Sequence, residues 1–409
     1  MTLKKAAWIV GLSGLVILPL VLGNPVAVPI LNQIGIAIIF ALSYNMVLGQ
    51  TGLLSFAHAV FFGFGGFAAV NVLRLASADG FPVPVPFVPL FGAACGLAMA
   101  ILLGSFTSKR VGMAFAMITM CLVELVIASA ILFGRFYGGS IDRTLPPEFL
   151  GIDFQSDISV YYLIVFWMLI SILGMAAYAR SPLGRMANAV RDNAARAEFI
   201  GYNTRVVRFA ALSVSGMFAG IAGSLFAIAY EFVGGEVISM STSSNVIIMA
   251  YIGGIGHFAG PILGAILLTL LQTTLSNYTE IWGLYVGLVF LATVMLAPKG
   301  LAGAIAAHLP VMQNGHWREL RYPYAISLAG GIILAIGAIG LLEMFSFRNE
   351  AGVGVSEMAL AGLTIDTATP WPWFGFGLAV VSGGLILRRA VPVARATWFQ
   401  AMEIRRNPD

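Results

Sequence analysis

The feature that most constrains this chain is a series of twelve apolar runs, most of them close to 20 residues long. About 20 apolar residues cross the hydrocarbon core of a bilayer as a helix. Of the 409 residues, 59% are hydrophobic and 10% are charged, whereas a soluble domain carries about 25% charged residues. The sequence therefore predicts an all-α, polytopic integral membrane helix bundle, with about ten core transmembrane helices and two C-terminal ones. The predicted runs are 6–23, 26–48, 53–73, 87–104, 111–133, 158–179, 207–230, 242–257, 259–277, 281–296, 323–344 and 372–387.

Two of these runs need an interpretation. The first, 6–23, follows Lys4 and Lys5 like a signal peptide, but no small-residue cleavage site precedes Asn24. We expect an uncleaved first membrane helix. The run 242–257 is short and broken by glycine, so it either spans the bilayer or forms a re-entrant segment with the run that follows it.

The basic residues predict the orientation, because positive residues collect in cytoplasmic loops. With a cytoplasmic N-terminus and all twelve runs spanning, 18 of the 22 basic residues fall inside. The four that fall outside are Arg74, Arg135, Arg143 and Arg348. We expect a multi-pass protein of the cell inner membrane with both termini in the cytoplasm. The net charge of +4 is too small to favour a nucleic-acid surface.

Loop composition predicts how the chain is divided. The external loops 134–157 and 346–370 are rich in Gly, Pro and Thr, and no segment is large enough for a soluble catalytic domain. Residues 1–300 are expected to form the transport core and 301–322 a cytoplasmic linker. Residues 323–409 would then form a two-helix membrane appendix with a basic tail.

The segment 43–67 places polar side chains and glycines at or near membrane depth. Irregular backbone at that depth is tolerated only against protein or a water-filled path. Gly49 and Gly52 therefore mark either a tight cytoplasmic turn or a solute contact, and both interpretations stay open. The candidate path residues here are Asn45, Gly49, Gly52, Ser55 and His58, of which His58 also fits a hydrogen-bonded packing role.

A second interrupted segment, 245–264, joins a short apolar piece to a helix through a glycine cluster. Paired interruptions in the two halves of a transporter point to a translocation path. The candidate path residues in this segment are Gly253, Gly254 and Gly256.

Glu124 lies near the middle of the run 111–133. A carboxylate at that depth costs about 2.5 kcal/mol or more unless it is solvated or paired, which makes it a functional-site candidate. A protonated or hydrogen-bonded packing carboxyl is the alternative.

The segment 181–201 predicts an amphipathic cytoplasmic helix. Ser181 suits its N-cap, Pro182 its first turn and Gly201 its C-cap. An apolar stripe of mostly alanine runs along one side, and Asp192 and Arg196 are spaced as an i,i+4 pair on the other. The helix could rest on anionic lipid, but the alanine-rich stripe fits a groove in a cytoplasmic protein better.

Several chemistries have no support in the sequence. No G-x-x-x-x-G-K-[ST] motif is present, so the chain has no P-loop for ATP hydrolysis, and no H-E-x-x-H or G-x-S-x-G motif indicates a hydrolase. The four histidines are scattered, and Cys95 and Cys121 lie inside apolar runs, so we expect no metal site and no cofactor. The chain is expected to be a transport subunit and not an enzyme.

Three segments together resemble the LivM-type permeases of the branched-chain amino acid ABC importers, over roughly residues 30–300. They are 45–67, the Ser-Pro-x-Gly-Arg to Arg-Asp-Asn segment from Ser181, and the glycines of 253–264. The resemblance implies that the cytoplasmic loop docks into an ATP-binding subunit. The matching docking residues are Ser181, Pro182, Gly184, Arg185, Arg191, Asp192, Asn193, Ala194, Ala197 and Gly201.

The same resemblance implies partners: a homologous LivH-type second permease subunit, two ABC ATPase subunits that use the ATP, and a periplasmic solute-binding protein. It implies import of branched-chain or related amino acids or similar small polar solutes. The rival interpretation is a self-sufficient secondary transporter or channel for urea, amides or amino acids. A secondary transporter should show several membrane acids, whereas Glu124 is the one deep carboxylate in the predicted spans, and a channel needs no docking helix. A structural membrane protein would leave the glycine-broken polar segments unexplained.

Overall fold

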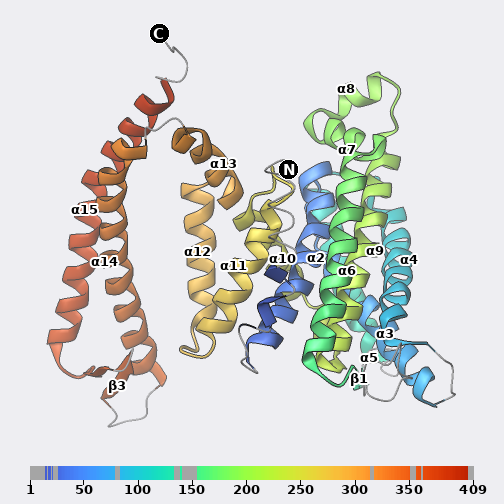
Figure 1. Ribbon diagram of the computed structural model, residues 1–409, viewed down its shortest axis with the longest axis horizontal. Helices are drawn as coiled ribbons and strands as arrows, with labels where there is room; N and C mark the ends of the chain where they lie inside the picture. Colours follow the sequence, from blue (N-terminus) through green and yellow to red (C-terminus); the bar gives the residue numbers. More distant parts are fainter. Residues whose placement is uncertain are drawn as a thin grey trace. The chain divides into compact units, whose positions relative to one another are not determined.

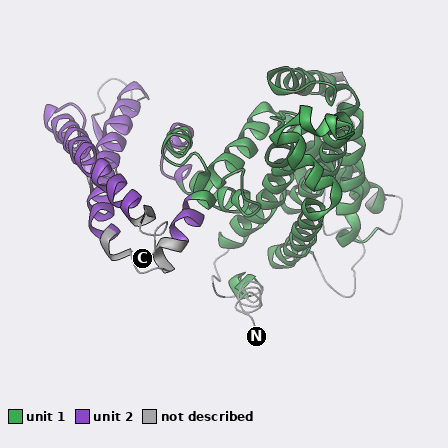
Figure 2. Cartoon of the chain, turned by 90° about the horizontal axis from the view of Figure 1, so that it is seen from above, with its two compact units in different colours: residues 1–274, 286–303 green, residues 275–285, 304–409 purple. Residues whose placement is uncertain are grey.

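The computed structural model describes residues 26–78, 83–132, 139–140, 154–313, 317–350, 356–360 and 363–403, with a few residues between 14 and 21. The described chain is almost entirely helical and divides into two compact units (Figure 2). Unit 1 comprises Met1–Thr274 with Val286–Gly303, and unit 2 comprises Leu275–Tyr285 with Ala304–Asp409.

The prediction of a polytopic helical membrane protein is confirmed. Within the described ranges, 8 helices are long and apolar enough to cross a membrane, or up to 9 if a bent pair of helices counts as one span. The run 6–23 lies largely outside the described residues, and each of the other eleven predicted runs coincides with a helix. These helices are α2 (Ala27–Thr51), α3 (His58–Ala78), α4 (Val88–Thr107), α5 (Gly112–Leu132), α6 (Asp157–Arg180), α9 (Thr204–Tyr230), α10 (Met240–Gly253), α11 (Gly260–Leu275), α12 (Trp282–Leu296), α14 (Trp317–Glu350) and α15 (Pro370–Glu403).

Of the twelve predicted runs, eight are long enough as described helices, 6–23 lies largely outside the described residues, and three form short helices. α10 has 14 residues, α11 has 16 and α12 has 15, against the roughly 20 that cross a bilayer. Turns at 254–259 and 276–281 separate these helices, and α12 ends at Leu296, shortly before Pro298.

Unit 1 is built around α9. In the most apolar stretch of 18 residues of this helix, 83% of the residues are buried. Helices α2, α3 and α4 pack against it (Figure 1). Glycines let the backbones approach: a Cβ on Gly96 of α4 would lie 2.8 Å from the Gly220 Cα of α9, and one on Gly92 would lie 2.7 Å from the Gly220 carbonyl oxygen. Small residues at such crossings are typical of membrane helix pairs, which associate through close packing.

The chain between α9 and α10 is not helical over most of its length and runs along α3. Val233 lies beside Gly66, and Ile238 lies beside Gly63. The Ser243 hydroxyl, in the first turn of α10, then donates to the Phe56 carbonyl and accepts from the Ala59 N–H at 3.2 Å. Val233 and Ile238 of this segment are therefore buried against α3, whereas Phe232 and Glu236 are exposed.

Two short elements precede α10 on this segment. Strand β2 (Phe232–Val233) pairs with β1 (Gly139–Ser140), and the 3-10 turn η2 (Gly235–Ile238) follows. A second 3-10 turn, η1 (Val85–Phe87), leads into α4.

Unit 2 contains the pair α14 and α15, joined by strands β3 (Glu357–Leu360) and β4 (Leu363–Asp366) in an antiparallel ladder. Glycines also allow this close packing, since Gly337 of α14 lies against the backbone of Phe376 in α15. The region expected as a linker, 301–322, is mostly helical: α13 (Gly300–Gln313) occupies its first part, and α14 begins at Trp317. The His308 ring of α13 lies 4.4 Å from that of Trp398 and bonds to Tyr324 at 3.0 Å, which ties the three helices together.

Candidate functional site

Two short helices, α7 (Pro182–Asp192) and α8 (Ala194–Phe199), form one end of unit 1 (Figure 1). The predicted caps are confirmed: the Ser181 hydroxyl accepts from the Gly184 N–H at 3.3 Å, and Gly201 has a φ of +96°. The single predicted helix is instead two, because Asn193 adopts an extended conformation. Its side chain accepts from the Arg196 N–H at 2.9 Å and starts α8.

This break changes the predicted charge pair. Asp192 does not pair with Arg196 four residues later but with its neighbour Arg191, at 3.0 Å. The expected i,i+4 geometry requires a continuous helix, and Asn193 interrupts it.

The alanine-rich stripe packs inward and not toward a partner. Ala187, Val190 and Ala197 are buried against Val207 of α9, with Met186 and Ala194 beside them. The stripe therefore attaches the α7–α8 pair to unit 1.

The opposite face of the pair carries exposed apolar and basic side chains. Phe199 is 94% exposed and Ile200 is 67% exposed. Arg185 and Arg196 are exposed as well. We define this set of Arg185, Arg196, Phe199 and Ile200 as the outer face of α7–α8.

The two glycine-broken segments meet at the end of α2. A Cβ on Gly49 would clash with the Asn45 side-chain oxygen and would lie 3.0 Å from the Ile255 carbonyl oxygen. Gly52 ends α2 with a φ of +70°. We call this meeting of the α2 end with the 253–256 turn the α2–α10 junction.

The glycines of the 253–256 turn have different surroundings. Gly253 packs against Gly260 and Gly264 of α11, and Gly254, with a φ of +108°, lies against the backbone of Lys299. A Cβ at Gly256 would have nothing within 4 Å. The first two glycines therefore permit backbone contacts within unit 1, whereas Gly256 borders open space.

Ser55 and His58 follow the junction and are fully buried. The His58 Nε2 bonds to the Ser215 hydroxyl of α9 at 2.8 Å, and that hydroxyl donates to the Ser43 carbonyl at 2.6 Å. Edge-on contact with Tyr44, at 4.7 Å between ring centroids, completes the surroundings of the His58 ring. These contacts match the packing role that the sequence left open for His58.

Several buried polar atoms on these segments lack a partner. Among the described residues, Asn45 Oδ1, Gln50 Oε1, His58 Nδ1 and His257 Nδ1 are buried without a hydrogen bond. Buried polar groups are nearly always paired, so each such atom needs an explanation, and water or a polar solute is a suitable partner.

Glu124 lies apart from this set. Its side chain is exposed on α5. This helix is the least buried of the spans in unit 1, since 28% of its apolar 18-residue stretch is buried. The buried face of α5 does reach the chain next to the junction, because the Thr119 hydroxyl accepts from the Phe56 N–H at 3.2 Å. The structure thus brings together the candidates of the two glycine-broken segments but leaves Glu124 on an open helix face.

Sequence reasoning missed the serine and threonine contacts that hold this region. Ser215, Ser243 and Thr119 each bond to the 56–59 stretch. The Ser-Thr-Ser-Ser run at 241–244, placed at the start of a short apolar segment, was the available signal for one of them.

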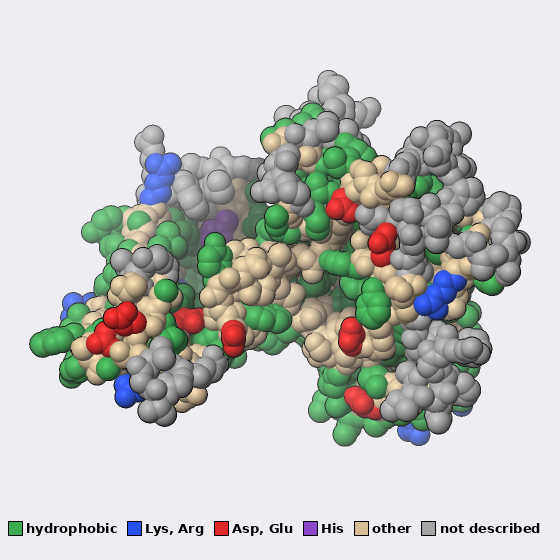
Figure 3. Space-filling view, turned by 90° about the horizontal axis from the view of Figure 1, so that it is seen from below, with side chains coloured by type: hydrophobic (Ala, Val, Ile, Leu, Met, Phe, Trp, Pro, Cys, Tyr) green, Lys and Arg blue, Asp and Glu red, His purple; other side chains and the backbone are tan. Residues whose placement is uncertain are grey.

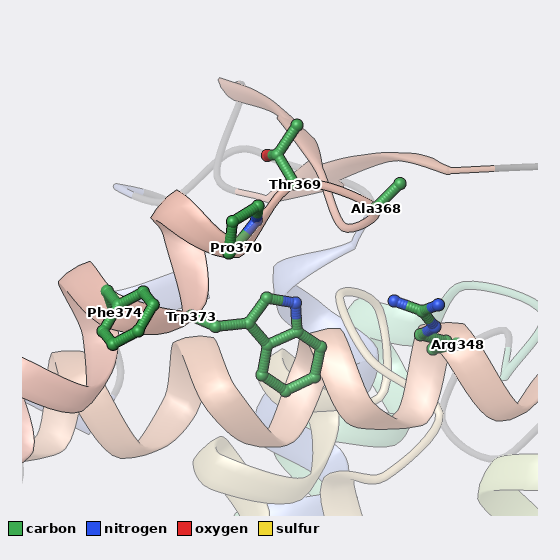
Figure 4. Close-up of a pocket in the computed structure, with 6 residues that line it drawn as sticks. All are labelled: Arg348, Ala368, Thr369, Pro370, Trp373 and Phe374. Carbon is green, nitrogen blue, oxygen red and sulfur yellow. The ribbon is translucent and has the colours of Figure 1, made fainter.

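A pocket in unit 2 contains none of the predicted site residues (Figure 4). It is an open hollow with Trp373 and Phe374 from the start of α15 on one side and Arg348 from the end of α14 on the other. Arg348 donates to the Thr367 carbonyl at 3.1 Å, which anchors the loop before α15. Across the described ranges, no group of three or more His, Cys, Asp or Glu side chains could hold a metal ion.

Comparison with known proteins supports the transport interpretation. Residues 26–298, well over half of the chain, match the family described as "Branched-chain amino acid transport system / permease component". The LivM high-affinity branched-chain amino acid permease protein of Escherichia coli (strain K12) is 27% identical over 296 residues, covering 65% of this chain and 67% of that protein. A probable LivH permease protein of Methanocaldococcus jannaschii is 21% identical over 286 residues, covering 65% of this chain and 88% of the other.

A shorter match, 34% identical over 116 residues, is to the autoinducer 2 import permease protein LsrC of Photorhabdus laumondii, covering 27% of this chain and 35% of that protein. No solved structure matches the chain. The family match covers the segments that form the α7–α8 pair and the α2–α10 junction, and the chain belongs to the branched-chain amino acid transport permease family.

Proposed function

We propose that this chain is the permease subunit of an ATP-binding cassette importer that moves branched-chain or related amino acids into the cytoplasm. The observation that carries the proposal is the α7–α8 pair, whose apolar stripe is fixed to α9 while Phe199 and two arginines face outward. Such a projection suits a docking site for an ATPase subunit, and a channel has no use for it.

The proposal includes the partners that the LivM and LivH relatives make reasonable. These are a homologous second permease subunit, two ABC ATPase subunits and a periplasmic solute-binding protein. Glu124 supports the second permease, because an exposed carboxylate in the middle of a span is costly in lipid and needs water or a protein partner. ATP is hydrolysed by the partner subunits, since permease subunits of this kind are not catalytic themselves.

The solute path is proposed to run beside the α2–α10 junction. Unpaired polar atoms of Asn45 and Gln50, at the end of α2, and the open space at Gly256 support it. The proposed path or gate residues at the junction are Asn45, Gly49, Gly52, Ser55, His58, Gly253, Gly254 and Gly256. Glu124 is a further path candidate, on the open face of α5 and apart from the junction.

The proposed orientation places the α7–α8 end in the cytoplasm of a cell with an inner membrane, with both termini on that side. Exposed arginines gather at the α7–α8 end of unit 1. The opposite end shows scattered acidic side chains together with some basic ones (Figure 3). Positive residues collect on the cytoplasmic side.

Unit 2 is proposed to hold a peripheral appendix, α14 and α15, outside the solute path. Its helices pack on each other through glycine contacts. Deleting 320–409 should lower the amount of assembled complex more than it alters solute preference. A truncated complex that assembles fully but carries a different solute would contradict this assignment.

The test of the proposed function is uptake by the purified complex in liposomes, with the binding protein present. ATP inside the liposomes should drive accumulation of labelled leucine, and ion gradients without ATP should drive none. Uptake that follows an ion gradient and ignores ATP would establish the rival secondary transporter.

A further inference from the structure

Arg191 lies on α7, yet its side chain turns inward to another helix. Its Nη1 donates to the Gly49 carbonyl of α2, 142 positions away in sequence. Its Nε and Nη2 both lie 3.0 Å from the Asp192 carboxylate, which holds the guanidinium plane. The guanidinium therefore bonds both to α2 and to Asp192, while 37% of the Arg191 side chain stays exposed.

This contact contributes to the C-terminal cap of α2. The last carbonyls of a helix lack partners within the helix. Here the Val47 carbonyl accepts from the Thr51 hydroxyl at 2.6 Å, the Leu48 carbonyl accepts from the Gly52 N–H at 3.1 Å, and the Gly49 carbonyl accepts from Arg191. A cation also suits this end of the helix dipole.

Glycine at position 52 makes room for the arginine. A Cβ there would lie 3.1 Å from the Arg191 Cγ, and the φ of +70° disfavours any residue with a side chain. The aliphatic part of the Arg191 side chain thus lies over Gly52, the residue in left-handed conformation that ends α2.

The contact joins the α7–α8 pair to the α2–α10 junction. Gly49, whose carbonyl Arg191 holds, is the residue that faces the Ile255 carbonyl and the Asn45 side chain. On the other side, Val190, next to Arg191, belongs to the apolar cluster that fixes α7 to α9. A displacement of α7 therefore acts directly on the end of α2.

We propose that Arg191 is a positioning residue that transmits movement of α7 to the α2–α10 junction, and that it does not bind the ATPase subunit itself. This inference rests on the proposed function, because only a permease driven from its cytoplasmic side uses such a link. The α7–α8 pair thus has two separate roles. Its outer face binds the ATPase subunit, and Arg191 moves the residues beside the solute path.

The test compares Arg191→Gln and Arg191→Lys with Arg205→Gln, an exposed arginine at the same end of unit 1. The full complex is reconstituted in liposomes, and the ratio of ATP hydrolysed to leucine imported is measured. We expect Arg191→Gln to raise this ratio about tenfold, within the range of coupling between linked sites. Arg191→Lys should lie between, since lysine keeps the charge but not the planar fork, and Arg205→Gln should match the wild type.

The outcomes separate the two proposals. If the wild-type complex shows no ATP-driven uptake, the proposed function fails. If it does, and assembled Arg191→Gln keeps the wild-type ratio, even with lower thermal stability, Arg191 only stabilises the fold and the inference is overturned.

If Arg191→Gln does not assemble, Gly52→Ala disturbs the same contact from the α2 side. We expect it also to raise the ratio, because the new Cβ displaces the arginine stem. A wild-type ratio in assembled Gly52→Ala would overturn the inference.

Discussion

Replacing Phe199 by alanine tests whether the outer face of α7–α8 is the docking surface. Phe199 is 94% exposed, so the change removes almost no packing within the chain, and the stability of the isolated permease should not change. A partner that buries this ring completely gains about 1.5–3 kcal/mol from it. Its loss should therefore weaken ATPase-subunit binding about ten- to a hundredfold.

The measurement is the affinity of the detergent-solubilised permease for its ATPase subunits, with thermal stability recorded in parallel. Tyr278→Ala is the matched control, because Tyr278 is an aromatic residue that is 85% exposed, on the turn after α11, and no docking role is assigned to it. Wild-type affinity in Phe199→Ala would refute the reasoning and move the docking surface elsewhere. Reduced stability of the isolated Phe199→Ala chain would show that the ring packs within the permease.

Three further outcomes are expected. Gly220→Ala should destabilise the protein by about 1–3 kcal/mol, because the new methyl group meets the α4 backbone. Gly287→Ala is the control and should be neutral, because its methyl group would have nothing within 4 Å. The two variants are heated in detergent, and the protein that stays soluble is measured. Glu124→Gln should change the transport rate per assembled complex, or its pH dependence, with little loss of folded protein, and wild-type rates across pH in both Gln and Leu variants would remove Glu124 from the path. Reporter fusions after Asp409 and within 346–370 should report opposite sides of the membrane; a periplasmic signal from the Asp409 fusion would contradict the proposed topology.

Much of the fold could be predicted because its determinants are local. Apolar runs fix where helices form in a bilayer, whatever they later pack against. The caps at Ser181 and Gly201 likewise depend on a few neighbouring residues. The prediction of one helix over 181–201 was wrong because it followed the apolar periodicity, which continues past Asn193. Asn193 is a good N-cap residue, and it starts a second helix.

The candidate site was predictable in its parts but not in its arrangement. Glycine interruptions marked both segments of the α2–α10 junction, but only the structure places Gly49 beside Ile255. The direction of the alanine-rich stripe could not be predicted either, because an apolar face packs equally well into its own protein or into a partner. The structure packs it against Val207 and leaves Phe199 outside.

By itself, then, the sequence determined that the chain is a multi-span helical membrane protein with a capped amphipathic segment and two glycine-broken segments. Hydropathy, caps and breaks are encoded within short stretches, so they can be read without tertiary contacts. Only the tertiary structure decided that Arg191 caps α2, that the chain before α10 runs along α3, and that Glu124 faces outward. Such contacts join residues far apart in sequence, and they depend on how the helices pack, which no local pattern specifies.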